Sequence, residues 1–555
     1  MDRQRRVSLM LVGLILLLAA GLRLYQLDRA DVITDEALIA FRSLGYVDFF
    51  ASPDQTTPWE WFSDVPAWAR LSFHDHPPLV FWLQHFSFFL FGENELGMRL
   101  PFVLAGAGSV ALLYLISVRL FDRQTGLVAS ALLAVAVSQV WVSRIGLQES
   151  LVVFFSLLTL YFFIRALETG THWQWGIALG LGLLAKYTAI VLLPVILVYL
   201  LIFKRGVFRD RRFWLALLLV LLLISPVVIY NLKLYQARGH FDLQLSYLLG
   251  QPVAEWQSLP GKIQAGSIID RPRSLLPNLY QGLLAPMSGL FALSLLVCGY
   301  RFTTGTSGPH RTALSLLLLA IAGHLLLFLV IGPSPRFVVT VVPYALLLVA
   351  WLLRRQPRVT RFGLLGLVLL LELFFTSNTL LAAYPVGQAG ITYSSLKTES
   401  YQWGYHQLNV YLEGLLDNRQ PAVSFPGRYP FLEDLKRRAL ERAQVAGDEP
   451  VSWLVVYDAN MYDLATLWIF HRQLVYHGWP AVTAGSYLEQ GLAYWRQQGI
   501  TDFYFIKAVD ATMLLEPAAA HTDAADQLAS QLNDVTPEII KRPDGREVFA
   551  VYHWQ

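Results

Sequence analysis

Long apolar runs separated by short polar connections dominate the first two thirds of the chain. The apolar runs cover residues 7–22, 101–118, 124–142, 150–166, 173–185, 188–203, 213–231, 280–299, 312–331, 337–353 and 362–380. Most of them approach the roughly 20 apolar residues that an α-helix needs to cross a bilayer. The pattern therefore predicts a polytopic α-helical membrane protein.

A further apolar run at residues 79–91 decides the predicted topology. It has 13 residues, which is too few for a crossing. If this run does not span the membrane, four Arg/Lys-rich connections lie on the side of the basic N-terminus, as the positive-inside rule expects. If it spans the membrane, all four connections lie on the opposite, outer side. We therefore predict an interfacial helix at 79–91, about eleven spans and a cytoplasmic N-terminus. The four connections are residues 119–123, 204–212, 301–311 and 354–361.

The same topology assigns the remaining polar segments to the outer face of the membrane. These segments are residues 23–100, 143–149, 186–187, 232–279 and 332–336, and the tail after residue 384. An alternative treats residues 1–22 as a cleaved signal peptide, but no convincing small-residue cleavage site follows them. An uncleaved first span is therefore the better interpretation.

The tail differs in pattern from the apolar part of the chain. Strand-like runs at 451–458, 501–508 and 546–554 alternate with helix-like stretches at 429–444 and 485–499. This alternation predicts a small α/β domain. We expect two domains: a membrane domain at 1–384, with a first outer loop at 25–100, and an extracytoplasmic α/β domain at 385–555. No internal repeat indicates a solenoid or an inverted-repeat transporter.

The composition agrees with a chain that mostly meets lipid. Only 15% of the 555 residues are charged, against roughly a quarter in soluble domains, and the mean hydropathy is +0.46. The net charge of +3 gives no reason to expect a nucleic-acid partner. Cys298 is the only cysteine, which excludes an intramolecular disulfide and a thiolate metal cluster.

Ionisable residues collect on the predicted outer face. They are Asp35, Glu36, His76, Arg144, Glu149, Lys186, Arg238, His240 and Arg336. Ionisable groups at membrane depth are functional candidates by default. Cations beside an apolar groove suit a lipid that carries phosphate, and a nearby carboxylate can act as general base on an incoming hydroxyl. Because neighbouring residues do not share a helix face, we expect different roles for Asp35 and Glu36, with Asp35 in the chemistry.

Each of these residues also has a purely structural interpretation, which the sequence leaves open. Thr34 with Asp35 and Glu36 would cap a helix. Lys186 would extend its amine to the membrane interface at a span end, and Arg336 would anchor a helix end. His76 would be a solvated loop residue, and Glu149 would pair with Arg144 in a turn. The stretch "HDH" at 74–76 lacks a helical or hairpin spacing of metal ligands. A divalent metal therefore stays open, and we assign no cofactor.

Several motifs in order resemble a known family. They are "TDEALIAFRSL" at 34–44, "HDHPPLVFWLQHFSFFLFGENELGMRLP" at 74–101, "GLQESLVVFFSLLTLYFF" at 146–163, "GLGLLAKYTAIVLLP" at 180–194 and "PSPRFVVTVVP" at 333–343. Over residues 10–345 the chain resembles the GT-C glycosyltransferases that use polyprenyl-phosphate sugars. The resemblance is to the protein O-mannosyltransferases and to the bacterial aminoarabinose transferases of lipid A.

The resemblance implies roles for the ionisable residues. It maps the catalytic acid to Asp35, with Glu36 beside it, and a second acid to Glu149, where the family usually has Asp. It maps the segments near the carrier phosphate to His76, Lys186 and Arg336. The outer-loop basic motif corresponds loosely to Arg238 and His240, and Arg144 lies in the turn before Glu149.

The expected function is transfer of a monosaccharide from a polyprenyl-phosphate carrier to an acceptor hydroxyl on a protein, lipid or glycan. Membrane lipid is a further partner, and the resemblance implies inversion at the anomeric carbon. A transporter or flippase for a lipid-linked or small polar substrate is the alternative, and a non-catalytic scaffold is a third. The one-sided placement of the polar groups and the intact acids favour the enzyme.

The predicted topology can be tested by cysteine accessibility in membranes. Single cysteines near positions 35 and 186, in a chain with Cys298 replaced, are expected to react with an impermeant thiol reagent from the outer side only. Cysteines in the basic connection at 204–212 are expected to react from the opposite side. Labelling of positions 35 and 186 from different sides would contradict the topology.

Overall fold

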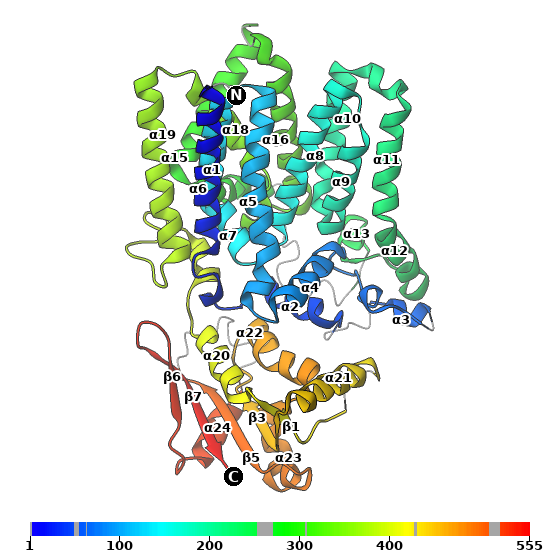
Figure 1. Cartoon of the computed structure of the whole chain (residues 1–555), viewed down its shortest axis with the longest axis vertical. Coiled ribbons are helices and arrows are strands. Elements are labelled where there is room, and N and C mark those ends of the chain that lie inside the picture. The colour runs from blue at the N-terminus through cyan, green and yellow to red at the C-terminus, as the bar shows by residue number, and fades with distance from the viewer. Residues whose placement is uncertain are drawn as a thin grey trace. The chain divides into compact units, whose positions relative to one another are not determined.

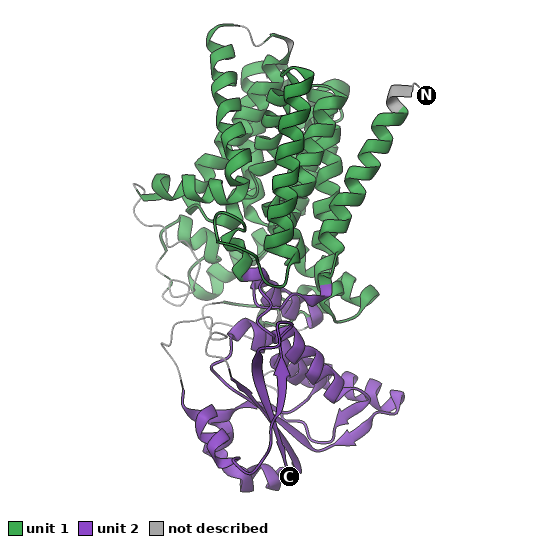
Figure 2. Ribbon diagram, turned by 90° about the vertical axis from the view of Figure 1, so that its left-hand side faces the viewer, with its two compact units in different colours: residues 1–27, 46–398 green, residues 28–45, 399–555 purple. Residues whose placement is uncertain are grey.

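The structure is a computed structural model that describes residues 3–48, 55–62, 64–251, 253, 270–305, 308–426, 430–509 and 522–555. Part of the predicted outer loop at 232–279, namely residues 252 and 254–269, lies outside the described residues. The chain forms two compact units (Figure 2). The first contains Met1–Leu27 and Tyr46–Thr398, and the second contains Asp28–Gly45 and Glu399–Gln555. The segment Asp28–Gly45 therefore interrupts the first unit in sequence and packs with the C-terminal part of the chain.

The first unit is a bundle of α-helices (Figure 1). Its helices are α1 (Arg3–Leu24), α3 (Pro58–Trp61), α4 (Leu79–Phe91), α5 (Glu95–Leu120), α6 (Arg123–Val135), α7 (Val137–Arg144), α8 (Glu149–Thr169), α9 (Trp173–Ala185), α10 (Leu192–Phe203), α11 (Arg211–Leu223), α12 (Ser225–Arg238), α13 (Leu243–Leu248), α15 (Asp270–Thr303), α16 (Arg311–Ile331), α17 (Pro335–Val338), α18 (Val342–Arg354) and α19 (Arg358–Thr376). A 3-10 segment η3 (Tyr187–Val191) precedes α10, and a π-helical segment η6 (Ser377–Leu381) follows α19.

The bundle confirms the prediction of a multi-pass membrane protein. Among the described residues, six helices are long and apolar enough to cross a bilayer, or up to eight if each of the bent pairs α6–α7 and α11–α12 is one span. The other predicted runs fall on the shorter apolar helices α9 and α18 and on the segment Tyr187–Phe203. The number of spans and their orientation stay predictions. The run at 79–91 is the separate helix α4, which packs on α5 and α9.

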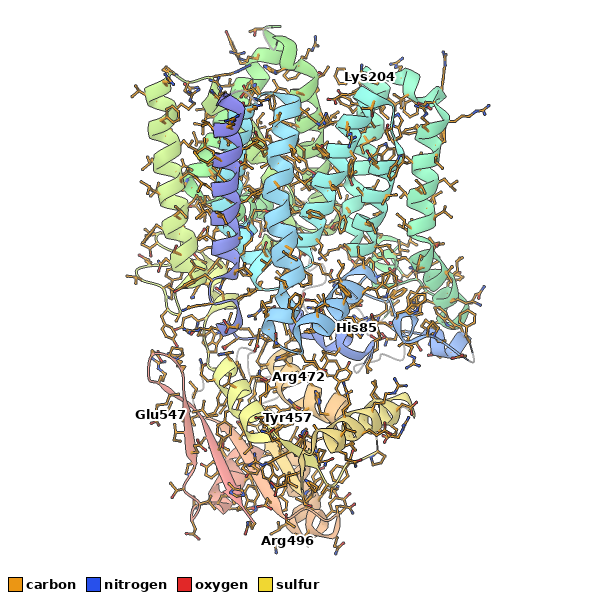
Figure 3. The ribbon with its side chains drawn as sticks, viewed as in Figure 1. His85, Lys204, Tyr457, Arg472, Arg496 and Glu547 are labelled. Carbon is orange, nitrogen blue, oxygen red and sulfur yellow. The ribbon has the colours of Figure 1, made fainter. Side chains whose placement is uncertain are left out.

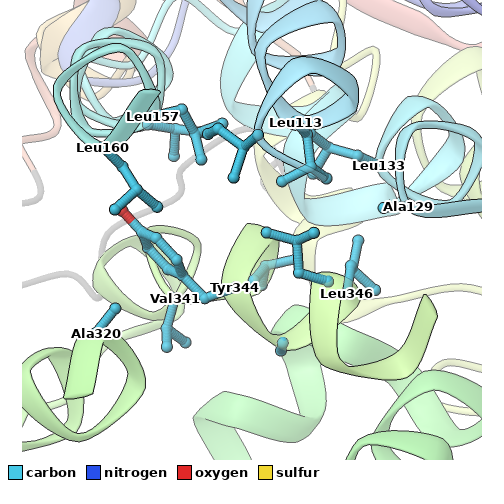
Figure 4. Packing of buried hydrophobic residues seen from close by; sticks show 14 of the residues in the cluster. Leu113, Ala129, Leu133, Leu157, Leu160, Ala320, Val341, Tyr344 and Leu346 are labelled. Atoms are coloured by element: carbon cyan, nitrogen blue, oxygen red, sulfur yellow. The ribbon is translucent and has the colours of Figure 1, made fainter. Parts of the chain in front are cut away.

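The centre of the bundle is built from helices that are apolar on all sides. Every residue of α18 from Val342 to Leu353 is buried, which is typical of a helix surrounded by other helices. Figure 4 shows Tyr344 and Leu346 of α18 packed near Leu113 of α5 and Leu157 of α8. The short length of α18 is therefore compatible with a position inside the bundle.

The apolar helices α6 and α7 are separated by a sharp bend, and side chains of α19 satisfy backbone groups at this break. The two helices meet at Ala136 with a bend of 55°. Thr376 Oγ1 donates to the carbonyl of Val135 at 2.7 Å, and the backbone N–H of Val137 donates to the carboxyl group of Glu372. Backbone groups freed inside a membrane protein must be bonded internally, so α19 stabilises this break.

Successive helices run in alternating directions, so their connections collect at two ends of the bundle (Figure 1). Figure 3 shows Lys204, in the connection between α10 and α11, at one end and His85, on α4, near the other. The start of α8, the end of α9 and α17 lie close together, because Glu149 pairs with Lys186 and interacts electrostatically with Arg336. Sequence-distant ionisable residues of the first unit therefore share one end.

The second unit confirms the predicted α/β domain. Its five-stranded sheet has the order β4-β3-β5-β7-β6, with β3 parallel to β4 and β5, and β7 antiparallel to β5 and β6. The strands are β3 (Trp453–Tyr457), β4 (Ala481–Thr483), β5 (Asp502–Ala508), β6 (Glu538–Lys541) and β7 (Glu547–Trp554), and a separate parallel pair is formed by β1 (Arg419–Pro421) and β2 (Glu449–Val451).

Helices complete the second unit. They are α2 (Asp35–Gly45), α20 (Tyr405–Leu416), α21 (Pro430–Ala446), α22 (Asp463–Thr466), α23 (Ala484–Gln497) and α24 (Ala524–Gln531), with the π-helical segments η8 (Leu467–His471) and η9 (Gln473–His477). Phe503 and Phe505 of β5 point to one face of the sheet and pack with Tyr487 of α23 and Leu528 of α24, as the two-residue period of a strand requires. The helix α2 packs on α22 and η8.

The boundaries of the units differ from the predicted domains in two segments. Residues 28–45 belong to the second unit, and residues 385–398 belong to the first. In the latter segment, Lys397 Nζ donates to the carbonyl of Ala382 at 2.6 Å, and the Asn378 amide bonds the carbonyls of Val386 and Thr392 at 2.9 Å each. How the chain divides into independently folding domains stays a prediction.

The stability of the second unit is expected to fall in mild acid because of His471. Its Nε2 lies 3.1 Å from Tyr457 Oη, and burial lowers its pKa to about 4. An unfolded imidazole takes up a proton below about pH 6.5, whereas the folded one stays neutral until about pH 4. Stability is therefore lost between these values, by about 2 kcal/mol at pH 5.

The measurement is the free energy of unfolding of the second unit in urea at pH 7 and at pH 5. Hydrogen exchange of the β5 amides reports the unfolding of this unit. His471→Gln removes the titrating group, so the variant is expected to show a smaller loss between the two pH values than the wild type. An identical pH dependence in both proteins would contradict the assignment.

Candidate functional site

The first unit contains a charged cluster built on Lys186 and Glu149. Glu149 is the first residue of α8, and Lys186 follows the last residue of α9 in an extended conformation. Because α8 and α9 are antiparallel neighbours, the two side chains meet: Lys186 Nζ lies 2.6 Å from Glu149 Oε1. Glu149 is 3% exposed and Lys186 is 20% exposed. A buried carboxylate requires such a partner, so this ion pair defines the local charge arrangement.

Arg336 adds a second cation to this cluster. It lies in α17, whose first turn is capped by Ser334 Oγ, the acceptor of a 3.3 Å hydrogen bond from the Phe337 N–H. The Arg336 guanidinium interacts electrostatically with Glu149, and the Phe337 ring lies 5.3 Å from Lys186 Nζ. Two cations and one carboxylate leave one net positive charge beside an aromatic ring. Such a cluster can bind an anionic headgroup with an apolar tail.

Arg144 is buried and holds the end of α1. Its Nη1 donates to the carbonyls of Leu22, Arg23 and Tyr25 at 3.1, 3.2 and 2.8 Å. These are the free carbonyls at a helix C-terminus, which attract cations. The turn ion pair between Arg144 and Glu149 that the sequence left open is not formed, because the Glu149 carboxylate pairs with Lys186.

His76 lies in a polar loop at 72–76. Its Nδ1 is 2.9 Å from Asp75 Oδ2, and the neighbouring His74 Nδ1 is 2.5 Å from Ser72 Oγ. The loop is tied to the start of α13, since the Leu243 N–H donates to the carbonyl of His74 at 2.8 Å. The side chain of His76 is only 15% exposed, so it is not a fully solvated loop residue.

Asp242 is the residue of this region that sequence reasoning missed. It is fully buried, and its carboxylate accepts hydrogen bonds from Tyr187 Oη and Asn231 Nδ2 at 2.7 Å each and from the Leu245 N–H at 2.9 Å. Burial raises the pKa of Asp242, and these hydrogen bonds oppose the rise. Tyr187 directly follows Lys186 in the chain. Its hydrogen bond to Asp242 therefore links the segment around Lys186 to the α12–α13 connection.

A local signal for Asp242 was present in the sequence. An Asp directly before the apolar stretch "LQLSYL" is typical of a helix N-cap, and Asp242 caps α13 through the Leu245 N–H. That signal predicts a cap, however, and not the bonds to Tyr187 and Asn231, which depend on how η3 and α12 pack.

Arg238 and His240 lie in the same connection. Arg238, the last residue of α12, pairs with Glu60 at 3.2 Å, and both side chains are partly exposed. His240 Nδ1 lies 2.8 Å from the carbonyl of Phe241. The structure thus brings together Glu149, Lys186 and Arg336, whereas the described contacts of Arg238 and His240 are with Glu60 and Phe241.

Asp35 and Glu36 belong to the second unit. They open α2, where Thr34 Oγ1 accepts a 3.3 Å hydrogen bond from the Glu36 N–H and the Thr34 carbonyl accepts one of 2.9 Å from Ala37. Thr34 therefore caps the helix, as the structural interpretation of the motif expects. Glu36 is fully buried, whereas Asp35 is partly exposed, so the adjacent carboxylates occupy different environments.

Within the described ranges, no three His, Cys, Asp or Glu side chains are arranged to hold a metal ion. The divalent metal that the sequence left open has no candidate ligand set in that part of the chain.

Comparison with known proteins shows where this chain has relatives. Residues 75–230 match the family model described as dolichyl-phosphate-mannose-protein mannosyltransferase. These residues include His76, Arg144, Glu149 and Lys186, and they exclude Asp35, Arg238, His240 and Arg336.

Two Bacillus subtilis proteins are similar in sequence. The chain is 27% identical over 243 residues to "Putative mannosyltransferase YkcB", covering 42% of this chain and 32% of that protein. It is 31% identical over 216 residues to "Putative mannosyltransferase YycA", covering 38% of this chain and 30% of that protein. The chain thus matches less than a third of the length of either relative.

A solved structure shares the fold over nearly the whole chain. The crystal structure of ArnT from Cupriavidus metallidurans bound to undecaprenyl phosphate aligns with a TM-score of 0.56 and 16% identity, covering 99% of this chain and 98% of that one. At this identity the match shows a common fold.

The ion pair at the centre of the cluster makes a prediction about stability. Lys186→Met leaves the buried Glu149 carboxylate without its nearest partner and is expected to destabilise the first unit by roughly 3 kcal/mol. Adding Glu149→Gln removes the buried charge and is expected to restore part of this loss. The measurement is thermal unfolding in detergent.

Arg119→Met is the matched control, because Arg119 and Glu168 form a more exposed pair whose loss is expected to cost about 1 kcal/mol or less. Equal effects of Lys186→Met and Arg119→Met, or a double variant less stable than Lys186→Met, would contradict the role of the buried pair.

Proposed function

We propose that this chain is a membrane glycosyltransferase of the GT-C superfamily, which its relatives and its fold support, and that it transfers a monosaccharide from a polyprenyl-phosphate carrier to an acceptor hydroxyl on the extracytoplasmic side. The observation that carries this proposal is the cluster of Lys186, Glu149 and Arg336. Lys186 and Glu149 lie in the segment that matches a family named for a lipid-phosphate sugar donor. The structure with the same fold contains undecaprenyl phosphate.

The carrier phosphate is bound by Lys186 and Arg336. Lysine binds phosphate as a point charge and arginine as a planar fork. Glu149 holds the Lys186 amine in place through the 2.6 Å ion pair, so the amine is positioned before the lipid binds. His76 is a further candidate for the phosphate or the sugar.

Charge develops on the carrier phosphate as the sugar leaves. The acceptor oxygen forms a bond to the anomeric carbon, the bond from that carbon to the phosphate oxygen breaks, and the phosphate keeps the electron pair. Fixed cations that stabilise this developing charge supply a large part of enzymatic rate enhancement. Lys186 and Arg336 have this role in the proposal.

The proton of the acceptor hydroxyl passes to Asp35. This assignment rests on the motif "TDEALIAFRSL" and on the partial exposure of Asp35, in contrast to the buried Glu36. We expect the reaction to invert the configuration at the anomeric carbon, as the resemblance to the GT-C family implies.

The proposal predicts separable effects of two variants. Asp35→Asn removes the base and is expected to lower the transfer rate by about 100-fold or more, with donor binding unchanged. Lys186→Met is expected to weaken donor binding. Transfer is measured in detergent with radiolabelled polyprenyl-phosphate mannose and related donors, with envelope material as acceptor.

Asp28→Asn is the matched control, because Asp28 is exposed, lies in the same segment and has no assigned role. Wild-type transfer by Asp35→Asn would exclude Asp35 as the base. Movement of the labelled lipid only in sealed vesicles, without transfer in detergent, would favour a flippase over an enzyme.

A further inference from the structure

The C-terminal part of the chain holds the acidic helix α2 through a buried aspartate. Asp31 is 1% exposed, and its carboxylate accepts hydrogen bonds from three backbone N–H groups. Oδ2 lies 2.6 Å from the Trp403 nitrogen and 3.1 Å from the Gly404 nitrogen, and Oδ1 lies 2.8 Å from the His406 nitrogen. Asp31 stands four residues before Asp35, so these bonds join the start of the acidic motif to residues about 370 positions later in the chain.

The three N–H groups belong to a helix end that lacks a cap of its own. Trp403 and Gly404 directly precede α20 and His406 is its second residue; the N-cap position is Gly404, with no side-chain cap and a φ of 108°. Only glycine adopts this backbone conformation without strain, and glycine has no side chain that could accept the free N–H groups of a helix start. A carboxylate at this place satisfies the N–H groups and matches the helix dipole. The cap of α20 is therefore supplied by Asp31.

A second contact holds the other half of α2. Tyr476 Oη donates to the carbonyl of Phe41 at 2.6 Å, and the two rings pack with centroids 5.1 Å apart. The last residue of α2, Gly45, lies so close to Tyr476 that a Cβ there would be 2.5 Å from its ring. Tyr476 belongs to η9 and is buried. The helix is thus fixed near both of its ends by residues 403–476.

An isolated helix of this length does not hold itself in place. The 11 residues of α2 fall below the roughly 12–15 residues at which isolated helices become even marginally stable in water. Its sequence neighbours on both sides, residues 27 and 46, belong to the first unit. The conformation of α2 must therefore come from its packing within the second unit.

From these contacts we infer that Asp31 and Tyr476 are positioning residues for Asp35, and that the C-terminal part of the chain serves to fix the acidic helix. This inference rests on the proposed function, because it gives Asp35 a role in the transfer reaction. It assigns the C-terminal part of the chain a function in holding a catalytic group. The acceptor is not part of the inference.

The test compares Asp31→Ala, Asp31→Asn and Tyr476→Phe with Asp28→Asn, in the full chain. Asp31→Ala is expected to lower kcat by roughly 100-fold, the loss that a displaced catalytic group produces, and Asp31→Asn is expected to lower it in the same direction. Tyr476→Phe, which keeps the ring and loses one hydrogen bond, is expected to lower kcat by roughly fivefold. The KM for the lipid donor is expected to stay within about twofold, since donor binding is assigned to the first unit.

Hydrogen exchange provides a readout that does not depend on activity. The amides of α2 and of the first turn of α20 are expected to exchange faster in the Asp31 variants, while those of α8 and α9 keep their wild-type rates. Asp28→Asn is expected to match the wild type in both assays. Tyr476→Phe keeps the inference testable if the Asp31 variants fail to fold.

The outcomes separate the two proposals. Unchanged exchange in α2, or faster exchange with wild-type kcat, would overturn the inference. A loss confined to donor KM would also overturn it. If the wild-type chain transfers no sugar from any donor, the proposed function fails, while the exchange data still confirm or overturn the attachment of α2.

Discussion

Charged and backbone polar groups that leave water must find partners inside the protein, and the arrangement of both units follows from this constraint. The Glu149 carboxylate is almost fully buried and is stable there because Lys186 lies 2.6 Å away. Arg144, also buried, bonds the carbonyls at the end of α1, and Asp242 gathers donors from η3, α12 and α13. Each of these groups joins at least two segments that are distant in sequence. Polar burial therefore determines how the connections at one end of the bundle are held together.

The same constraint explains the irregular helices of the bundle. The α6–α7 break at Ala136 leaves backbone groups that Thr376 and Glu372 of α19 satisfy. At the α11–α12 bend of 50°, Pro226 follows the break, as expected for a residue without an N–H to donate. Both devices let a span change direction inside an apolar bundle. The α6–α7 break also positions α7, whose last residue is Arg144.

The second unit is more than an appended domain. Its sheet and surface helices follow ordinary α/β packing, but one of its helices, α2, comes from the segment between the first span and the rest of the bundle. Asp31 accepts hydrogen bonds from three backbone N–H groups at the start of α20, so removing its carboxylate takes one partner from each of them. The candidate phosphate-binding residues Lys186 and Arg336 are held by the packing of the first unit, whereas the candidate base Asp35 is held by the packing of the second unit.

The long apolar helices and three of the strands of this protein were predictable from its sequence alone, and residue types identified the candidates for its site. The apolar runs coincide with helices, the alternating pattern of the tail coincides with β3, β5 and β7, and Lys186, Glu149 and Arg336 were identified from their residue types and places. These features are readable because hydrophobic length and periodicity are local properties. The ion-pair and hydrogen-bond partners of the charged groups could not be predicted from such local properties.

The tertiary structure pairs Glu149 with Lys186, 37 residues away, although Arg144 lies only five residues away in the chain. It also decided that Asp242 joins Tyr187 to Asn231 and that Asp31 caps a helix more than 370 residues later. The break at Ala136 had no proline or glycine to announce it. The physical reason is the same in each case: a buried polar group is satisfied by whatever donor or acceptor the packing brings within 3 Å, and that neighbour is set by the fold of the whole unit and not by the residues beside it in the chain.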